Sequence, residues 1–446
     1  MNRRKKKNAK FQQTKLEKSI RRLRKKKRGY ITAGLSENKT EIKLEVYDFL
    51  KDKKFDDIEY RKRLLVRNGG TIQLTIPVIF SIMLNPDETI DMLRRIFYYC
   101  INPNVNHIIF NHKDCVELEI AASTIMDTIV LAANTYRKKN GTELIVSGSY
   151  PRNDKARKIL VASGLVEHLN IKNKDFVRTD NLLLFKLANG KSGLRQSGTI
   201  ATRITDYYNE CLHTQHYQLT EDGKCYLANM FGEIVDNCEI HGGEHAIWYA
   251  LGHYHEYQDN DYGELQLVIF NYGDTIYEQM ISEQTSVETR EKINYMIERH
   301  RKFFDATWTE EEMLTVFSLQ EGISRLTDSA TIGYKNRGKG TVILMDKFNK
   351  IGKTVNDEKP MFSLTSGRTH IVFDNNYKLE RKHIADEVLG TGEKRIIAFN
   401  ADNDIFQRAD RRNVQRIKEY FPGTIISMKV YVDSKYLTKL KGNKYE

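Results

Sequence analysis

Three polar residues, Glu233, Asn237 and His241, stand one helical turn apart in the run F-G-E-I-V-D-N-C-E-I-H-G-G at 231–243. In a helix, positions i, i+4 and i+8 share one face, and the apolar residues between them face elsewhere. An Asn side-chain oxygen is a hard ligand that suits Mg²⁺, and a carboxylate one turn earlier can orient or deprotonate a water or hydroxyl in line with a terminal phosphate. The stripe therefore predicts a helix that holds a divalent cation and phosphates; a solvated polar pair is the alternative that spacing alone leaves open.

The elements that must complete such a site are two glycine-containing turns further along the chain. Residues 265–270 (L-Q-L-V-I-F) are typical of a buried strand and lead into N-Y-G-D at 271–274. Residues 333–341 read G-Y-K-N-R-G-K-G-T ahead of another apolar run. Glycines in this loop allow backbone N–H groups to wrap phosphates at a helix N-terminus, and a neighbouring Arg or Lys adds positive charge. A lone G-x-G is a weak signal, so the loop gains meaning only from its order after the helix and the first turn.

This order of helix, strand with a glycine turn, and glycine-rich loop resembles the GHKL ATP-binding fold shared by gyrase-type topoisomerases, histidine kinases and MutL-type repair proteins. E-I-V-D-N is similar to the family's N box, N-Y-G to its first glycine box and R-G-K-G to its second, and N-C-E-I-H-G is most similar to the anti-sigma serine kinases and histidine kinases. The resemblance implies ATP and Mg²⁺ as cofactors, Glu233 as the catalytic base and Asn237 as the metal ligand. The nucleotide-binding residues that it implies are Asn237, His241, Asn271, Gly273, Arg337, Gly338, Lys339, Gly340 and Thr341.

One position departs from the family pattern. The family generally places an Asp where this chain has Asn271, and that Asp accepts the adenine N6 hydrogens. The Asn oxygen can accept the same hydrogen bond, but the amide also carries a donor, so purine selectivity is less certain. The chain has neither a P-loop nor a Rossmann glycine motif, and His112 lacks the context of a sensor-kinase phosphoacceptor.

Residues 30–190 alternate predicted strands (71–84, 107–110, 143–146) with predicted helices (91–99, 116–133, 153–162), which indicates an α/β layer domain. The stretch 144–151 followed by 158–165 resembles a STAS domain, the protein partner of anti-sigma kinases. That resemblance implies a phosphorylated serine, for which Ser123 is the nearest candidate; a hydroxyl on a helix face is the alternative.

Composition and charge limit the class of protein. The chain has 446 residues and a net charge of +12, but residues 1–28 hold fifteen Lys or Arg against Glu17 alone, so the rest is nearly neutral. This arm is compatible with nucleic-acid binding or with a solubilising tail. Five cysteines without C-x-x-C spacing, no secretory signal and no apolar run long enough for a bilayer predict a cytoplasmic protein with no membrane contact.

The predicted fold class is α/β, with a basic arm (1–29), a STAS-like domain (30–190), a linker near 190–200 and a GHKL α/β sandwich domain (198–434). That last domain carries insertions near 277–330 and 381–420. In the first insertion, where relatives place a mobile lid, W-T-E-E-E at 308–312 is typical of a capping box, and a rigid helix pair is the alternative. Helices are also predicted at 200–213 and 341–348, strands at 361–366, 370–373 and 423–432, and a loose terminus from Lys435.

The function predicted from these features is that of a magnesium–ATP-binding ATPase or ATP-gated switch in bacterial regulation or defence, coupled to the STAS-like domain. A serine/threonine protein kinase of the partner-switching type is the first alternative. A nucleic-acid-associated ATPase that binds through residues 1–28 is the second. A protein partner at the STAS-like domain and a homodimer are compatible with all three.

Overall fold

The computed structural model describes residues 39–52, 55, 70–164, 166, 181–240, 242–243, 245–257, 262–323, 353–355, 358–374 and 376–442. The chain divides into two units, Met1–Lys43 and Leu44–Glu446. Helix α2 (Lys39–Asp52) crosses this division, and the second unit is mixed α/β with several sheets. The predicted arm at 1–29, the glycine-rich loop at 333–341, the helix at 341–348 and His241 lie outside the described residues.

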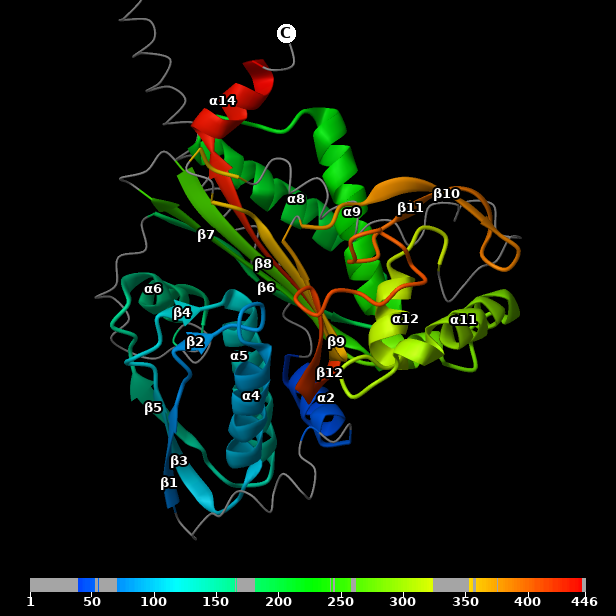
Figure 1. The fold of residues 1–446 in the computed structure, drawn as a ribbon. Helices are drawn as coiled ribbons and strands as arrows, with labels where there is room; N and C mark the ends of the chain where they lie inside the picture. The colour runs from blue at the N-terminus through cyan, green and yellow to red at the C-terminus, as the bar shows by residue number, and fades with distance from the viewer. Residues whose placement is uncertain are drawn as a thin grey trace, which may run out of the picture. The chain divides into compact units, whose positions relative to one another are not determined.

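The N-terminal part of the second unit is built on three parallel strands in the order β1-β3-β5. Helices connect and follow these strands, as parallel strands require. Two of the helices lie between this sheet and the larger sheet that follows (Figure 1). The elements are β1 (Gly70–Thr75), β2 (Ile79–Phe80), α4 (Pro86–Ile101), β3 (Val105–Asn111), β4 (Glu117–Leu118), α5 (Ile120–Lys139), β5 (Ile145–Ser149) and α6 (Asp154–Ser163).

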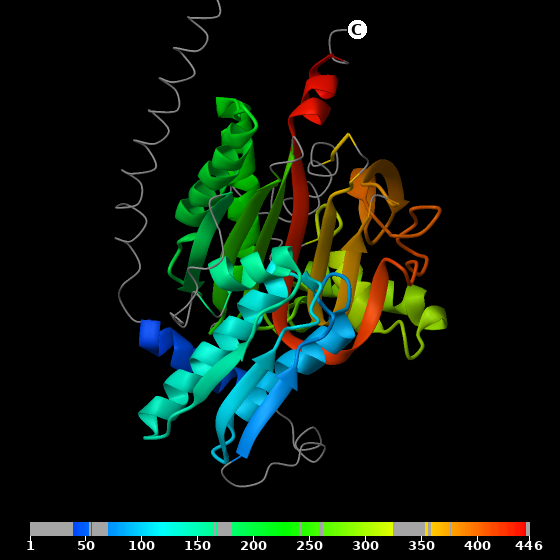
Figure 2. The same ribbon diagram turned by 90° about the vertical axis from the view of Figure 1, so that its left-hand side faces the viewer.

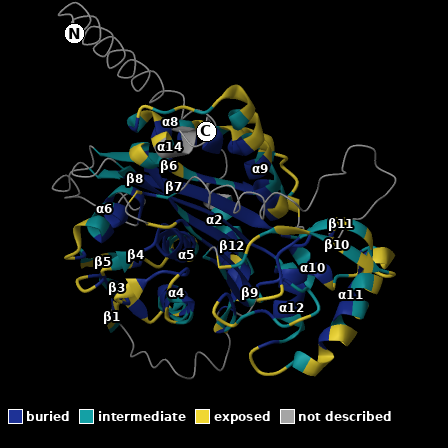
Figure 3. Cartoon of the chain, turned by 45° about the horizontal axis from the view of Figure 1, so that its top comes forward, coloured by how far each residue is buried: buried dark blue, intermediate teal, exposed yellow. Residues whose placement is uncertain are grey.

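The larger sheet has five antiparallel strands in the order β6-β7-β8-β12-β9. Two long helices, α8 and α9, cover one of its faces, and α4 and α5 lie against the other (Figures 1 and 2). Its central strands are buried along most of their length (Figure 3). The elements are β6 (Leu182–Lys191), α8 (Ser197–Thr214), α9 (Glu221–Ile240), β7 (Ile247–Tyr257), β8 (Tyr262–Tyr272), β9 (Met361–Phe373) and β12 (Val414–Asp433).

Strand β12 is interrupted near its start. Its pairing with β9 shifts register between Arg416 and Phe421 and again before Thr424. Gly423 has φ of 142°, a backbone conformation that favours glycine. These irregularities bend the strand next to the end of β8, where the candidate site lies.

The two segments predicted as insertions carry further elements of the C-terminal half. Helices α10 (Ile276–Met280), α11 (Val287–His300) and α12 (Glu310–Ser318) follow β8, and a short 3₁₀ turn η2 (Arg301–Phe303) separates the last two. The second insertion begins with an antiparallel hairpin of β10 (Glu380–Asp386) and β11 (Gly390–Ile396), which lies on the same side as α11 and α12 (Figure 2). Met313, Leu314 and Phe317 of α12 are buried in the core, which favours the rigid alternative over a mobile lid for this helix.

Several predicted elements are confirmed, with changed bounds. The helices predicted at 91–99, 116–133, 153–162 and 200–213 correspond to α4, α5, α6 and α8, and the strands at 107–110 and 265–270 to β3 and β8. Asn153 caps α6 by accepting the N–H of Ala156 at 3.0 Å. Thr309 and Glu312 form the predicted capping box of α12.

Other expectations differ from the structure. The strand predicted at 71–84 is two strands, β1 and β2, because Pro77 lacks the N–H that a continuous ladder needs. The chain from Ser434 to Gly442 is helix α14, not a loose terminus. Strand β7 had no predicted counterpart, and the strands at 361–366 and 370–373 are one strand, β9. Strand β6 pairs with β7, so it belongs to the five-stranded sheet although the predicted boundary placed it in the STAS-like domain.

Candidate functional site

Helix α9 is held by its apolar side and presents its polar stripe outward. Leu227, Phe231, Ile234 and Cys238 recur at helical spacing, and all four are buried against the core shared with α8 and the sheet. Glu221 and Asp222 in the first turn suit the positive end of the helix dipole.

Two residues of the predicted stripe can be located on this helix. Glu233 is half-buried and Asn237, one turn later, is exposed. Asn237 therefore has the accessibility that a metal ligand needs. His241, the third member, lies outside the described residues.

The turn after β8 is bonded directly to the end of α9. The backbone N–H of Asp274 donates to the carbonyl oxygen of Gly242 at 2.7 Å, and Asn271 Nδ2 donates to the carbonyl oxygen of Cys238 at 3.5 Å. The Asn271 side chain is only 2% exposed, and its Oδ1 accepts the N–H of Thr424 on β12 at 2.8 Å. The helix end, the turn and β12 therefore meet at this one amide, although they are far apart in the chain.

Glycine is required at three positions around this amide because backbone segments touch there. A Cβ added at Gly242 would lie 2.3 Å from Asn271 Nδ2, and one at Gly273 would lie 2.2 Å from the carbonyl oxygen of Gly242. A Cβ at Gly423 would lie 2.0 Å from the carbonyl oxygen of Asn271. Any side chain at these positions would separate α9, β8 and β12.

Two acidic side chains and one aromatic side chain lie beside the turn, next to α10: Asp274, Glu278 and Tyr420. Thr275 caps α10 in a capping box with Glu278, and Gln279 Nε2 donates to Asp274 Oδ2 at 2.7 Å. The Tyr420 hydroxyl donates to Glu278 Oε1 at 3.1 Å. Burial raises the pKa of Tyr420, so this hydroxyl remains a donor at neutral pH. These contacts fix the direction in which the chain leaves the candidate site.

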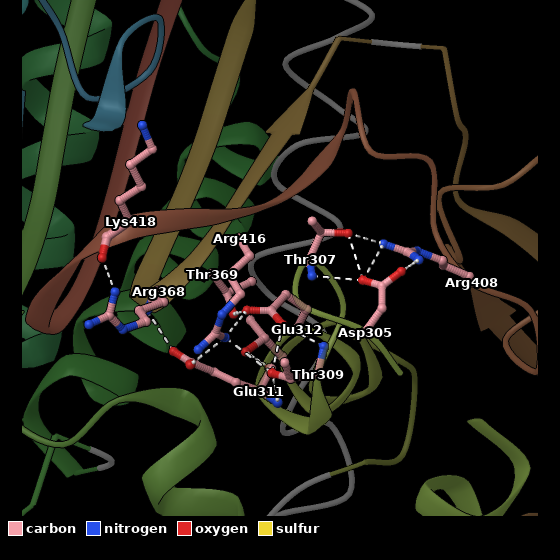
Figure 4. Close-up of polar contacts among 11 residues, drawn as sticks. Asp305, Thr307, Thr309, Glu311, Glu312, Arg368, Thr369, Arg408, Arg416 and Lys418 are labelled. Atoms are coloured by element: carbon pink, nitrogen blue, oxygen red, sulfur yellow. Dashed lines mark hydrogen bonds and ion pairs between the residues drawn. The ribbon is translucent and has the colours of Figure 1, made fainter. Parts of the chain in front are cut away.

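Next to this group, a network of ion pairs fastens α12 to β9 and β12 (Figure 4). Arg416 Nη1 lies 3.1 Å from Glu311 Oε2 and 2.7 Å from Glu312 Oε1. The backbone N–H of Arg368 donates to Glu311 Oε1 at 2.6 Å. The guanidinium of Arg368 donates to the carbonyl oxygen of Lys418. Burial raises the pKa of Glu311. The network supports the bent start of β12. The sequence predicted the capping box at 309–312, but it did not indicate that Arg416 and Arg368 would bond this helix start.

The glycine-rich loop of the predicted site is not tested by these contacts. Arg337, Gly338, Lys339, Gly340 and Thr341 all lie outside the described residues. Across the part of the chain that the structure describes, no group of three or more His, Cys, Asp or Glu side chains is placed to hold a metal ion. Magnesium commonly binds through few protein ligands together with phosphate and water, so a cation beside Asn237 would take its other ligands from a nucleotide and solvent.

Ser123, the candidate phosphoacceptor, is not accessible. It lies within α5 and is 2% exposed. A Cβ added at Gly164 would come 2.9 Å from its Oγ, so the chain after α6 packs directly over this hydroxyl. Its position favours the alternative of a packed hydroxyl on a helix face.

Comparison of this chain with protein-family models, with curated proteins and with solved structures finds no match. Across the helices that the structure describes, none is both long and apolar enough to cross a bilayer.

Proposed function

We propose that this chain binds a magnesium–nucleoside triphosphate beside the C-terminal half of α9 and acts as a GHKL-type ATPase or nucleotide-gated switch. The supporting observation is the hydrogen bond from Asp274 to Gly242, which joins the two segments that resemble the N box and the first glycine box. Such an arrangement is expected if the two segments contact one ligand. ATP is the nucleotide that the resemblance implies.

In this proposal Asn237, which is exposed on the surface of α9, binds the cation through its side-chain oxygen. Glu233, one turn earlier, orients or deprotonates a water near the terminal phosphate. ATP supplies the phosphoryl group and Mg²⁺ neutralises its charge. Gly242 and Gly273 allow the end of α9 and the turn after β8 to pack in direct contact, which fixes the position of the turn relative to Asn237 and Glu233.

Binding of Mg–ATP to the full chain by isothermal titration calorimetry tests the proposal. Replacing Asn237 with Ala is expected to weaken binding at least about tenfold, since a ligand of the metal is lost. Cys225→Ser, an exposed position in the first turns of the same helix, serves as the matched control and should leave affinity unchanged. Equal affinities for the wild type and Asn237→Ala would refute the proposed metal ligand.

The switch form of this proposal is supported by the contacts of β12. Thr424 bonds Asn271, while five and six residues earlier Glu419 pairs with Arg94 of α4 and the N–H of Lys418 donates to Asp87 Oδ1 at 2.6 Å. One short segment of β12 therefore contacts both the candidate nucleotide turn and the N-terminal layer. Hydrogen exchange of α4 should slow on addition of nucleotide to the wild type, and unchanged exchange would argue for binding without switching.

A protein kinase of the partner-switching type stays the alternative for a separate substrate protein, since burial of Ser123 disfavours transfer within the chain. Incubation with ATP labelled at the terminal phosphate separates the two activities. An ATPase releases labelled phosphate, whereas a kinase transfers the label to protein. Deletion of residues 1–28 tests nucleic-acid stimulation in the same assay.

A further inference from the structure

A small cavity lies among α11, α12 and the segment 398–407. Its volume is about 10 Å³, which is close to the space that the centre of one water molecule needs. Most of the side chains around it are apolar and come from α11 and α12. The polar ones that border it are His300, Trp308, Gln320 and Gln407.

The protonation of the His300 ring is determined by one hydrogen bond. Its Nε2 lies 2.8 Å from the carbonyl oxygen of Ile405. A carbonyl can only accept, so Nε2 carries the hydrogen, and in the neutral ring Nδ1 is left as an acceptor. Burial lowers the pKa of His300, which favours this neutral form at neutral pH. Nδ1 is itself buried, and no described residue donates a hydrogen bond to it.

Trp308 supplies the opposite group. Its Nε1–H can only donate, and this atom is also buried with no acceptor in the described part of the chain. Both side chains are 2% exposed, and their ring centroids lie 6.1 Å apart at an interplanar angle of 32°. Two neighbouring rings that border one cavity therefore hold an unused donor and an unused acceptor, which do not bond each other.

We infer that this cavity is a binding site for one ordered water molecule, which accepts the hydrogen of Trp308 Nε1 and donates to His300 Nδ1. A buried donor and a buried acceptor left unpaired are unfavourable, and a single water satisfies both. Cavities that stay dry are apolar, whereas buried waters bond about three polar groups. The water joins the end of α11 to the residue before the capping box of α12, and the inference does not depend on the proposed nucleotide site.

Nuclear magnetic resonance of the full chain, with nitrogen-15 in its tryptophan indoles, tests this inference. The sequence has two tryptophans, Trp248 and Trp308, so two indole N–H signals are expected, and Trp308→Phe or Trp248→Phe assigns them. The bound water should give a nuclear Overhauser cross-peak from the water resonance to the Trp308 indole hydrogen. No Ser, Thr or Tyr is among the described residues that line the cavity, so a nearby hydroxyl cannot produce that cross-peak by exchange.

A variant tests the second partner. His300→Phe keeps an aromatic ring but removes the acceptor, and it should abolish the cross-peak because a water with one partner is no longer held in an otherwise apolar cavity. His213→Phe, the same substitution at an exposed position of α8, is the matched control and should leave the cross-peak unchanged.

The outcomes are decisive in both directions. A Trp308 indole hydrogen without a water cross-peak in the wild type overturns the inference. A cross-peak of full intensity in His300→Phe overturns the bridge between the two rings. Circular dichroism checks that His300→Phe folds; if it does not, the wild-type spectrum decides alone.

Discussion

One face of the five-stranded sheet is apolar, whereas the opposite face, called the polar face below, mixes apolar residues such as Val268 and Phe270 with buried polar and charged ones. Along β8, Leu265, Leu267 and Ile269 belong to the apolar core under α8 and α9. The alternate residues Glu264 and Gln266 point the other way and bond the N-terminal layer. Successive side chains of a strand alternate between faces, so one strand carries both surfaces.

The polar face is joined to the N-terminal layer by directional contacts. Gln266 Oε1 accepts the N–H of Ile120 at the start of α5 at 3.1 Å, and Thr128 of α5 lies 2.7 Å from the Tyr272 hydroxyl. Lys155 of α6 pairs with Glu264 at 2.9 Å. An apolar face contributes most of the free energy of folding, whereas a buried polar face mainly selects one geometry. The difference teaches that α9 is held mainly by apolar packing, whereas the N-terminal layer adds registered hydrogen bonds and an ion pair to its packing.

The largest effect is expected on the apolar face. Phe231 of α9 is 1% exposed within the core, and Phe231→Ala should lower the free energy of unfolding by about 3–5 kcal/mol, since it removes buried surface and leaves a cavity. Urea denaturation of wild type and variant measures the difference. A loss below about 1.5 kcal/mol would mean that this face is not the main source of stability.

On the polar face, Glu264→Ala should cost about 2–3 kcal/mol, because Lys155 and Lys429, whose side chains are 25% and 18% exposed, lose a buried counter-charge. The same denaturation assay measures it. The triple variant Glu264→Leu with Lys155→Met and Lys429→Met should recover most of that loss, since apolar replacement of a buried ion pair is often neutral. If the triple variant is less stable than Glu264→Ala, the polar face contributes more than geometry.

Acid should weaken the polar face. Burial lowers the pKa of His253 to about 4 and also lowers that of His255, which lies beside Lys158. A lowered folded pKa favours the neutral ring, so this stability is present above the unfolded pKa near 6.5 and is lost as pH falls toward 4. Between pH 7.5 and 5.0, His253 alone should account for about 2 kcal/mol.

Unfolding free energies at these two pH values, compared for wild type and His253→Gln, isolate that residue. His112 and His370, whose pKa values burial also lowers to about 4, contribute the same sign in both proteins and cancel. An identical pH dependence in the two proteins would contradict the assignment to His253.

The smallest effects are expected away from both faces. Thr309→Ala removes the capping box of α12 and should cost about 1 kcal/mol. Lys224→Ala, which breaks a pair with Glu221 on the surface of α9, should leave the free energy of unfolding unchanged, because an exposed pair gains little. Thermal unfolding of both variants gives the ranking, and a larger effect of Lys224→Ala would reverse the order expected from burial.

Features of the fold that depend on residues close together in the chain were predicted from the sequence, whereas features that depend on distant residues were not. The starts of α6 and α12 were predictable because Asn153 and Thr309 bond residues two or three positions away. Strand β7 was missed because nine of its eleven residues are buried, so its sequence lacks the alternation of a half-exposed strand. The place of β6 was missed because its partner β7 lies more than fifty residues later.

For the candidate site, the sequence marked Glu233, Asn237 and Asn271 by residue type and order, and it placed Thr424 only within the strand predicted at 423–432. It gave no sign that Thr424 would bond the Asn271 oxygen, or that Glu278 and Tyr420 would pair beside the turn. These contacts depend on the register of β12 against β8, which is set by packing along both strands.

The sequence by itself determined the local features of this protein: the apolar stripe and polar stripe of α9, the caps of its helices and the glycines that a close approach requires. Only the tertiary structure decided which backbone groups the Asn271 amide bonds and which face of the sheet receives the N-terminal layer. The physical reason is that helix periodicity and capping act over a few residues, whereas the partners of a buried amide are chosen by strands that come together from distant parts of the chain.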